Sequence, residues 1–201
     1  MRATPHGAVG ITSIACFGGC LSCVVALHVL RSDLDPLGHR LSEYANGPYG
    51  AVMTAAFWML GLGSMSLARE LRLTLHLPGT SRLVPVLLAV SGVGMVVSGV
   101  FETRGGTPPT LTEIIHSRAS GTALVTLIAA AVLLAARPPN EPGPAWGSTV
   151  LAVLAAAVGG VSPLLHDSRW TGAVQRLLGL TLVTWLVVTA SWVRQLRLAR
   201  Q

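Results

Sequence analysis

Long apolar runs alternate with short polar segments along the whole chain. Six runs reach the length of about 20 residues that an α-helix needs to cross a bilayer core of about 30 Å. These runs cover residues 8–30, 49–68, 83–101, 114–136, 146–165 and 171–193. The breaks between them are short and collect Pro, Gly, Asn and charged residues. The pattern predicts an all-α, polytopic transmembrane bundle of six helices that forms a single domain over residues 1–201.

The amino-acid composition indicates a membrane protein and favours the lipid bilayer over nucleic acid as its partner. Of the 201 residues, 51% are hydrophobic and 11% are charged, whereas soluble domains carry about 25% charged residues. The formal net charge of +6 would fit nucleic acid, but the arginines are scattered between apolar runs and form no basic stripe with interleaved aromatics. We therefore expect a multi-pass protein of the cell membrane whose partner is the lipid bilayer and not nucleic acid.

Arginine distribution predicts the orientation in the membrane, because cytoplasmic loops carry an excess of basic residues. If both termini are cytoplasmic, the arginines on the inner side are Arg2, Arg69, Arg72, Arg82, Arg137, Arg194, Arg197 and Arg200. Those on the outer side are Arg31, Arg40, Arg104, Arg118, Arg169 and Arg176. The inner side also holds fewer acidic residues. We therefore expect both termini to be cytoplasmic.

The three predicted outer connections share a mixture of carboxylate, guanidinium and imidazole side chains. Gln175 and Arg176 lie more than one turn inside the last helix, where a guanidinium is costly unless it finds a partner or water. Glu43, Glu102 and Glu113 are candidate partners, although Thr110 and Glu113 also form a capping-box pattern. We expect a polar His/Glu/Arg pocket at the outer face. Its candidate binding residues are Ser42, Glu43, Tyr44, Glu113, His116, Gln175 and Arg176.

Several kinds of cofactor chemistry remain open, and none has a tight motif. A metal site could use His39, His116 and His166 with Asp167 or Glu113, since three such ligands and a water make a hydrolytic centre, but the chain has no HExxH sequence. His28 and His116 would be the pair for a haem within the bilayer. An ion-coupled carrier needs polar groups at mid-membrane, and these helices have almost none there. The residues therefore leave the cofactor unknown.

Three stretches resemble a family of bacterial six-span membrane proteins known as domain of unknown function 998. They are LSEYANGPYG after the first run, FETRGG followed by TLTEIIHSRAS, and GAVQRL in the last run. The resemblance covers nearly the whole chain and implies the six-span fold without an established activity. From this resemblance an acidic residue would be expected after Phe-x-Thr, but Arg104 stands there. This difference argues against metal binding by this chain.

Together these patterns predict a membrane protein that binds or processes an amphipathic, lipid-like molecule from the outer side. Two alternatives remain. One is a structural or accessory membrane subunit in which Glu43 and Arg176 only hold helices together, and the other is a metal-dependent membrane hydrolase. The residues identify no reaction, so they leave open whether the chain is an enzyme.

Overall fold

The structure is a computed structural model that describes residues 9–75, 79–101, 108–137, 143–144, 146–165 and 168–200. The long helices are α1 (Val9–Leu30), α2 (Gly50–Thr74), α3 (Val84–Val100), α4 (Leu111–Ala135), α5 (Trp146–Val161) and α6 (Thr171–Leu198). Short 3-10 helices lie in three connections: η1 (Leu41–Ala45), η2 (Gly79–Leu83) and η3 (Ser162–Leu165). Within the described ranges the chain has no β-strand, and six helical segments are long and apolar enough to cross a membrane. The predicted all-α, six-helix class is confirmed.

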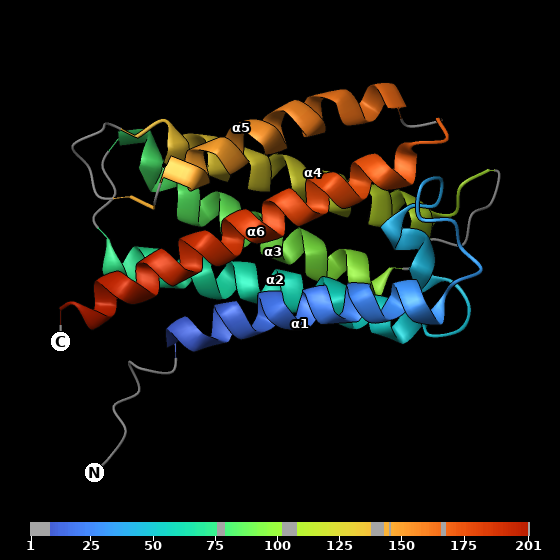
Figure 1. The fold of residues 1–201 in the computed structure, drawn as a ribbon, viewed down its shortest axis with the longest axis horizontal. Coiled ribbons are helices and arrows are strands. Elements are labelled where there is room, and N and C mark those ends of the chain that lie inside the picture. The colour runs from blue at the N-terminus through green and yellow to red at the C-terminus, as the bar shows by residue number, and fades with distance from the viewer. Residues whose placement is uncertain are drawn as a thin grey trace, which may run out of the picture.

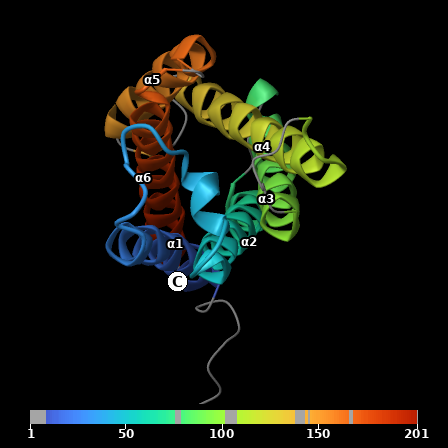
Figure 2. The ribbon, with the colours of Figure 1, turned by 90° about the vertical axis from the view of Figure 1, so that its right-hand side faces the viewer.

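The six helices run up and down and follow one another around a ring (Figures 1 and 2). Each helix packs against the next, and α6 closes the ring by contacting α1 as well as α5. The start of α1 and the end of α6 lie at one end of the bundle, together with the end of α2, the start of α3, the end of α4 and the start of α5, and we call this the terminal end. The opposite end carries the connection 31–49, the end of α3, the start of α4, η3 and the start of α6, and we call it the loop end.

Apolar side chains cover the outside of the bundle as well as its interior. Trp185 and Leu127 are buried among the helices, while Val125, Val153 and Leu180 are exposed on the outer faces. A helix that is apolar all round is stable only where its surroundings are apolar too. This arrangement therefore belongs in a lipid bilayer, and the chain is a multi-pass membrane protein.

Helices α2 and α3 approach so closely that their backbones touch. A Cβ placed on Gly61 would lie 2.6 Å from the carbonyl oxygen of Gly92, and a Cβ on Gly92 would lie 2.6 Å from the carbonyl oxygen of Gly61. Small residues permit this approach between membrane helices. The glycines of these two runs therefore serve packing.

Helix α2 continues past the predicted apolar run, which stops at residue 68, and ends at Thr74. The added turns hold Arg69, Glu70 and Arg72, whose polarity ends the hydropathy signal. Glu70 is nevertheless buried, because the hydroxyl groups of Ser13 and Ser66 donate to its carboxylate at 3.2 and 3.1 Å. One hydrogen bond from α1 and one from the preceding turn of α2 thus hold the Glu70 side chain in the interior. The apolar pattern alone would have ended α2 before this residue.

Candidate binding site around Arg176

The connection between α1 and α2 folds back over the loop end and places η1 inside the outline of the helical ring (Figure 2). Tyr44 of η1 is 0% exposed, and its hydroxyl donates to the carbonyl oxygen of Leu34 at 3.4 Å. Since η1 contacts both α2 and α6, Tyr44 and Ala45 of this connection are buried in the protein interior.

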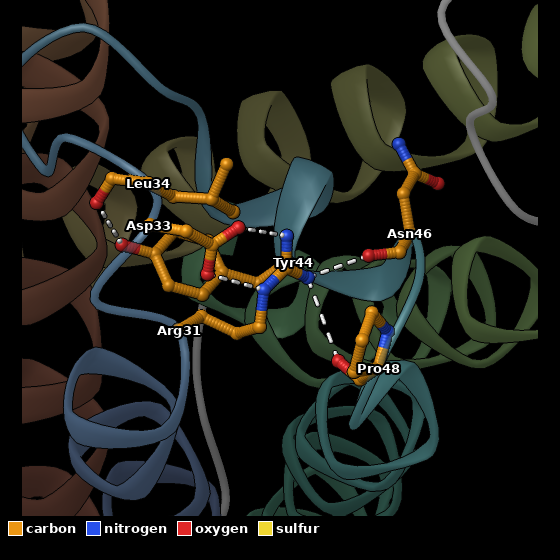
Figure 3. A network of polar contacts seen from close by, with 6 residues as sticks. All are labelled: Arg31, Asp33, Leu34, Tyr44, Asn46 and Pro48. Carbon is orange, nitrogen blue, oxygen red and sulfur yellow. Dashed lines mark hydrogen bonds and ion pairs between the residues drawn. The ribbon is translucent and has the colours of Figure 1, made fainter.

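Arg31 holds the two halves of this connection together (Figure 3). Its guanidinium makes a two-pronged ion pair with Asp33, each N–O distance being 2.9 Å, and donates to the carbonyl oxygen of Asn46 at 2.6 Å. The bond to Arg31 lowers the pKa of the Asp33 carboxyl below its ordinary value. The same bond raises the pKa of Arg31, so this pair stays charged at neutral pH.

Arg176 links α6 to α1 and to the connection that follows α1. Its Nε donates to Nε2 of His28 at 2.8 Å, and its Nη1 donates to the carbonyl oxygens of His39 at 2.7 Å and Gly172 at 3.1 Å. The ring centroid of Tyr44 lies 5.3 Å from the guanidinium carbon. Arg176 is the sixth residue of α6, which places it about 8 Å along the helix from its first residue.

Every partner of Arg176 among the described residues is electrically neutral. The imidazole of His28 accepts a hydrogen bond from a guanidinium that stays protonated in proteins, so its Nε2 carries no proton. The other partners are two backbone carbonyl groups and an aromatic ring. The remaining nitrogen, Nη2, is buried and has no hydrogen-bond acceptor among the described residues.

The expected pairing of Arg176 with the carboxylate of Glu43 is not seen. Glu43 instead accepts a hydrogen bond from the backbone N–H of Arg40 at 3.2 Å and completes a capping box at the start of η1. The carboxylate is used locally, three residues from its partner. A local contact of this kind costs less chain entropy than a contact between distant segments.

Three further predicted residues lie around η1. The side-chain oxygen of Gln175 accepts a hydrogen bond from the backbone N–H of Leu41 at 2.6 Å, which ties η1 to α6. Tyr44 is buried beside Arg176, and Ser42 is half-buried on η1. Gln175, Arg176 and Tyr44 are therefore brought together at one place on the loop end.

Glu113 and His116 form a second group at the start of α4. Glu113 closes the predicted capping box with Thr110, whose backbone N–H donates to the carboxylate at 2.7 Å. The His116 ring is buried, with Nδ1 2.9 Å from the carbonyl oxygen of Ser98 and 2.8 Å from that of Phe101. His116 and Arg176 share none of these partners, so the structure divides the predicted site residues into two groups.

The three histidines proposed as metal ligands do not form a group that the structure displays. Within the part of the chain that the structure describes, no cluster of three or more His, Cys, Asp or Glu side chains is arranged to hold a metal ion. The His39 ring faces its own loop, with Nδ1 3.2 Å from the carbonyl oxygen of Asp35. His166 lies outside the described residues, so the three-histidine site stays a prediction.

A polar network at the terminal end was not foreseen from the sequence. Besides Ser13 and Ser66 on the Glu70 carboxylate, Arg197 of α6 donates to the hydroxyl of Thr74 at 2.6 Å and to the backbone carbonyl of Glu70 at 3.2 Å. The spacing of Ser66, Glu70 and Thr74, four residues apart on one face of α2, was the available signal. This network fastens α6 to α2.

The described residues form an all-helical membrane bundle in which polar side chains, among them the half-buried Arg176, meet at one end. The chain belongs to the family described as protein of unknown function (DUF998), whose model matches residues 14–192. Neither the curated proteins nor the solved structures include a match to the chain. The function has to be inferred from the site.

Proposed function

We propose that the chain binds an amphipathic molecule with an acidic headgroup at the loop end, and that Arg176 recognises the acidic group. The single observation that carries this proposal is a guanidinium at membrane depth whose partners, within the described residues, are all neutral. Arg176 is half-buried and its Nη2 atom is fully buried, and a charge partly withdrawn from water without a counter-ion is destabilising. Such a cost is understandable where the missing negative charge belongs to a ligand.

Two properties of the site favour an amphipathic ligand over a fully polar one. Arg176 lies within one to two turns of the end of α6, close to the level at which lipid headgroups meet hydrocarbon. Leu177 and Leu180, on the same stretch of α6, are exposed on the outside of the bundle. An acidic headgroup on the guanidinium therefore leaves its apolar tail next to helix faces that suit it.

Binding of dihexanoyl phosphatidylglycerol tests the proposal, because this lipid carries an acidic phosphodiester and short chains. In a scintillation proximity assay with the tritiated lipid, we expect Arg176→Gln to weaken binding at least about tenfold, the effect of losing a charge-assisted hydrogen bond. Arg169→Gln is the matched control, because Arg169 is exposed at the same end and stacks on Trp170. Equal binding by both variants, or equal binding of dihexanoyl phosphatidylcholine, would contradict the proposal.

A purely structural role is the second candidate, because Arg176 joins α6, α1 and the connection after α1. The two roles predict opposite effects of Arg176→Met on the lipid-stripped protein. In a binding site, the unpaired charge costs stability, so its removal should leave the unfolding temperature unchanged or raise it. In a structural joint, the loss of its hydrogen bonds should lower the unfolding temperature.

We also propose that the terminal end faces the cytoplasm. The described residues at that end include Arg69, Arg72, Arg82, Arg137, Arg194, Arg197 and Arg200, with Glu70 as the acidic residue. At the loop end the described arginines are offset by Asp33, Asp35, Glu43 and Glu113. The basic excess at the terminal end supports this orientation, which leaves the Arg176 site open to the outer leaflet.

A further inference from the structure

The hydrogen bond between Arg176 and His28 requires a neutral His28. The Nδ1 atom of His28 lies 2.7 Å from the carbonyl oxygen of Val24 and donates to it, which leaves Nε2 to accept from Arg176. A proton added to Nε2 would set two donors and two positive charges against each other across 2.8 Å. This hydrogen bond is therefore incompatible with a charged His28.

An anion between His28 and Arg176 would remove the repulsion between them, because it can accept hydrogen bonds from both side chains. The Nη2 donor of Arg176 is buried without an acceptor among the described residues, and Nε2 of His28 becomes a second donor when it is protonated. His28 also occupies the last turn of α1, where the helix dipole favours a positive charge. An acidic group between the two side chains would meet two cations in place of one.

We propose that the acidic group enters this site together with a proton that is taken up by His28. This inference rests on the proposed function. It adds that binding is regulated by pH and that the site selects a negatively charged ligand. The proton binds Nε2, the Arg176–His28 hydrogen bond breaks, and one anionic oxygen group accepts from both residues. No other bond is made or broken, and the protein takes up one proton for each anion bound.

The other charged groups near His28 already have partners of their own. On η1, Glu43 accepts from the backbone of Arg40, and the ring of Tyr44 lies 5.4 Å from that of His28. In the 31–40 connection, Asp33 pairs with Arg31, and Asp35 accepts from the backbone N–H groups of Leu37 and Gly38. Helix α2 has no ionisable side chain before Arg69. None of the described carboxylates hydrogen-bonds to His28, so none replaces the anion.

Binding of tritiated dihexanoyl phosphatidylglycerol at about pH 5.5 and about pH 8 tests the inference, since histidine titrates in this range and the phosphodiester does not. We expect wild-type affinity to be at least about fivefold higher at the lower pH, a typical coupling between two sites. The deacylated headgroup, glycerophosphoglycerol, forms a parallel arm. Binding that keeps its pH dependence without the chains would identify a free anion as the ligand, and loss of binding would identify a lipid.

Two substitutions of His28 fix the charge at this position, one as neutral and one as positive, and so remove the pH dependence of the affinity. His28→Gln keeps a neutral acceptor for Arg176, so its affinity should stay low at both pH values. His28→Lys provides a permanent cation, so its affinity should be high at both. His39→Gln separates the two neighbouring histidines: it keeps the pH dependence if His28 takes the proton and loses it if His39 does, which would overturn the inference.

The failures of the two proposals look different. If wild-type binding depends on Arg176 but is equal at both pH values, the proton uptake is wrong and the proposed function stands. If wild-type protein binds neither probe at either pH, both are wrong. Circular dichroism of each variant shows whether it folds, and an unfolded His28→Gln leaves the wild-type pH comparison and His28→Lys to decide.

Discussion

Two arginine side chains at the loop end, Arg31 and Arg176, need hydrogen-bond partners for their charged groups, and the partners they find differ. Arg31 finds a carboxylate two residues away and carbonyl oxygens beyond it, whereas Arg176 finds neutral groups alone. The first arrangement is self-contained and fits a structural role. The second includes no carboxylate among its described partners, and the proposed function rests on that observation.

At the residue scale, we expect Arg31→Met to destabilise the protein by about 1–3 kcal/mol, because it leaves the carbonyl oxygen of Asn46 without its donor. Thermal unfolding in detergent measures this effect. The control is Arg118→Met, which removes an exposed guanidinium from α4 at the same end. Equal unfolding temperatures for the two variants would show that the Arg31 network contributes nothing to stability.

The pH dependence of the same network has a defined sign. The pKa of folded Asp33 is lowered by Arg31, so the ion pair stabilises the protein above the ordinary aspartate pKa of 3.8 and is lost as pH falls through the lowered value. In Arg31→Met the pKa of Asp33 should rise toward 3.8. Carbon-13 labelling of the aspartate carboxyl groups and NMR titration follow this change, and an unchanged titration in the variant would refute it.

At the element scale, hydropathy located the helices well because a bilayer imposes one length and one kind of surface on every span. The run predicted over 171–193 corresponds to α6, which continues to Leu198, and the run over 49–68 corresponds to α2, which continues to Thr74. Both helices extend through charged residues that bond across the bundle, Arg197 to Thr74 among them. Such bonds depend on the partner helix, which a local pattern does not contain.

The site was only half predictable for the same physical reason. The position of Arg176 inside the last apolar run was enough to predict that its guanidinium needs a polar partner, because an unpaired arginine at that depth is costly. Which residue is the partner was not predictable, because His28 and Arg176 are 148 positions apart and meet only when the ring closes. The sequence favoured a carboxylate, Glu43, but that group bonds within its own turn. Likewise, nothing in the local pattern of 41–45 indicated that Tyr44 would be buried.

The contact between α2 and α3 gives a prediction at the element scale. Gly61→Ala or Gly92→Ala should destabilise the protein by about 1–3 kcal/mol, because the new methyl group meets a carbonyl oxygen of the opposite backbone. Gly121→Ala is the control, since nothing lies within 4 Å of a Cβ at that exposed position of α4. It should be neutral or stabilising by up to about 1 kcal/mol. Similar thermal unfolding of Gly61→Ala and Gly121→Ala would contradict this packing.

At the scale of the whole molecule, the up-and-down ring places both termini at one end and the 31–49 connection at the other. Single cysteines in a background without Cys16, Cys20 and Cys23 test the proposed orientation. A membrane-impermeant maleimide applied to intact cells should label Leu37→Cys and spare Leu198→Cys, both of which replace exposed side chains at opposite ends. The reverse labelling would invert the topology and move the Arg176 site to the inner leaflet.

Closure of the ring by α6 has a consequence for biosynthesis. The ribosome releases α1 first and α6 last, so the translocon delivers five helices with an open seam between α1 and α5 before the final span arrives. Until then His28 lacks its hydrogen bond from Arg176, and the core lacks the buried ring of Trp185. A chain that stops before Thr171 would therefore persist as an incomplete insertion intermediate, which is the kind of species that membrane proteases and chaperones remove.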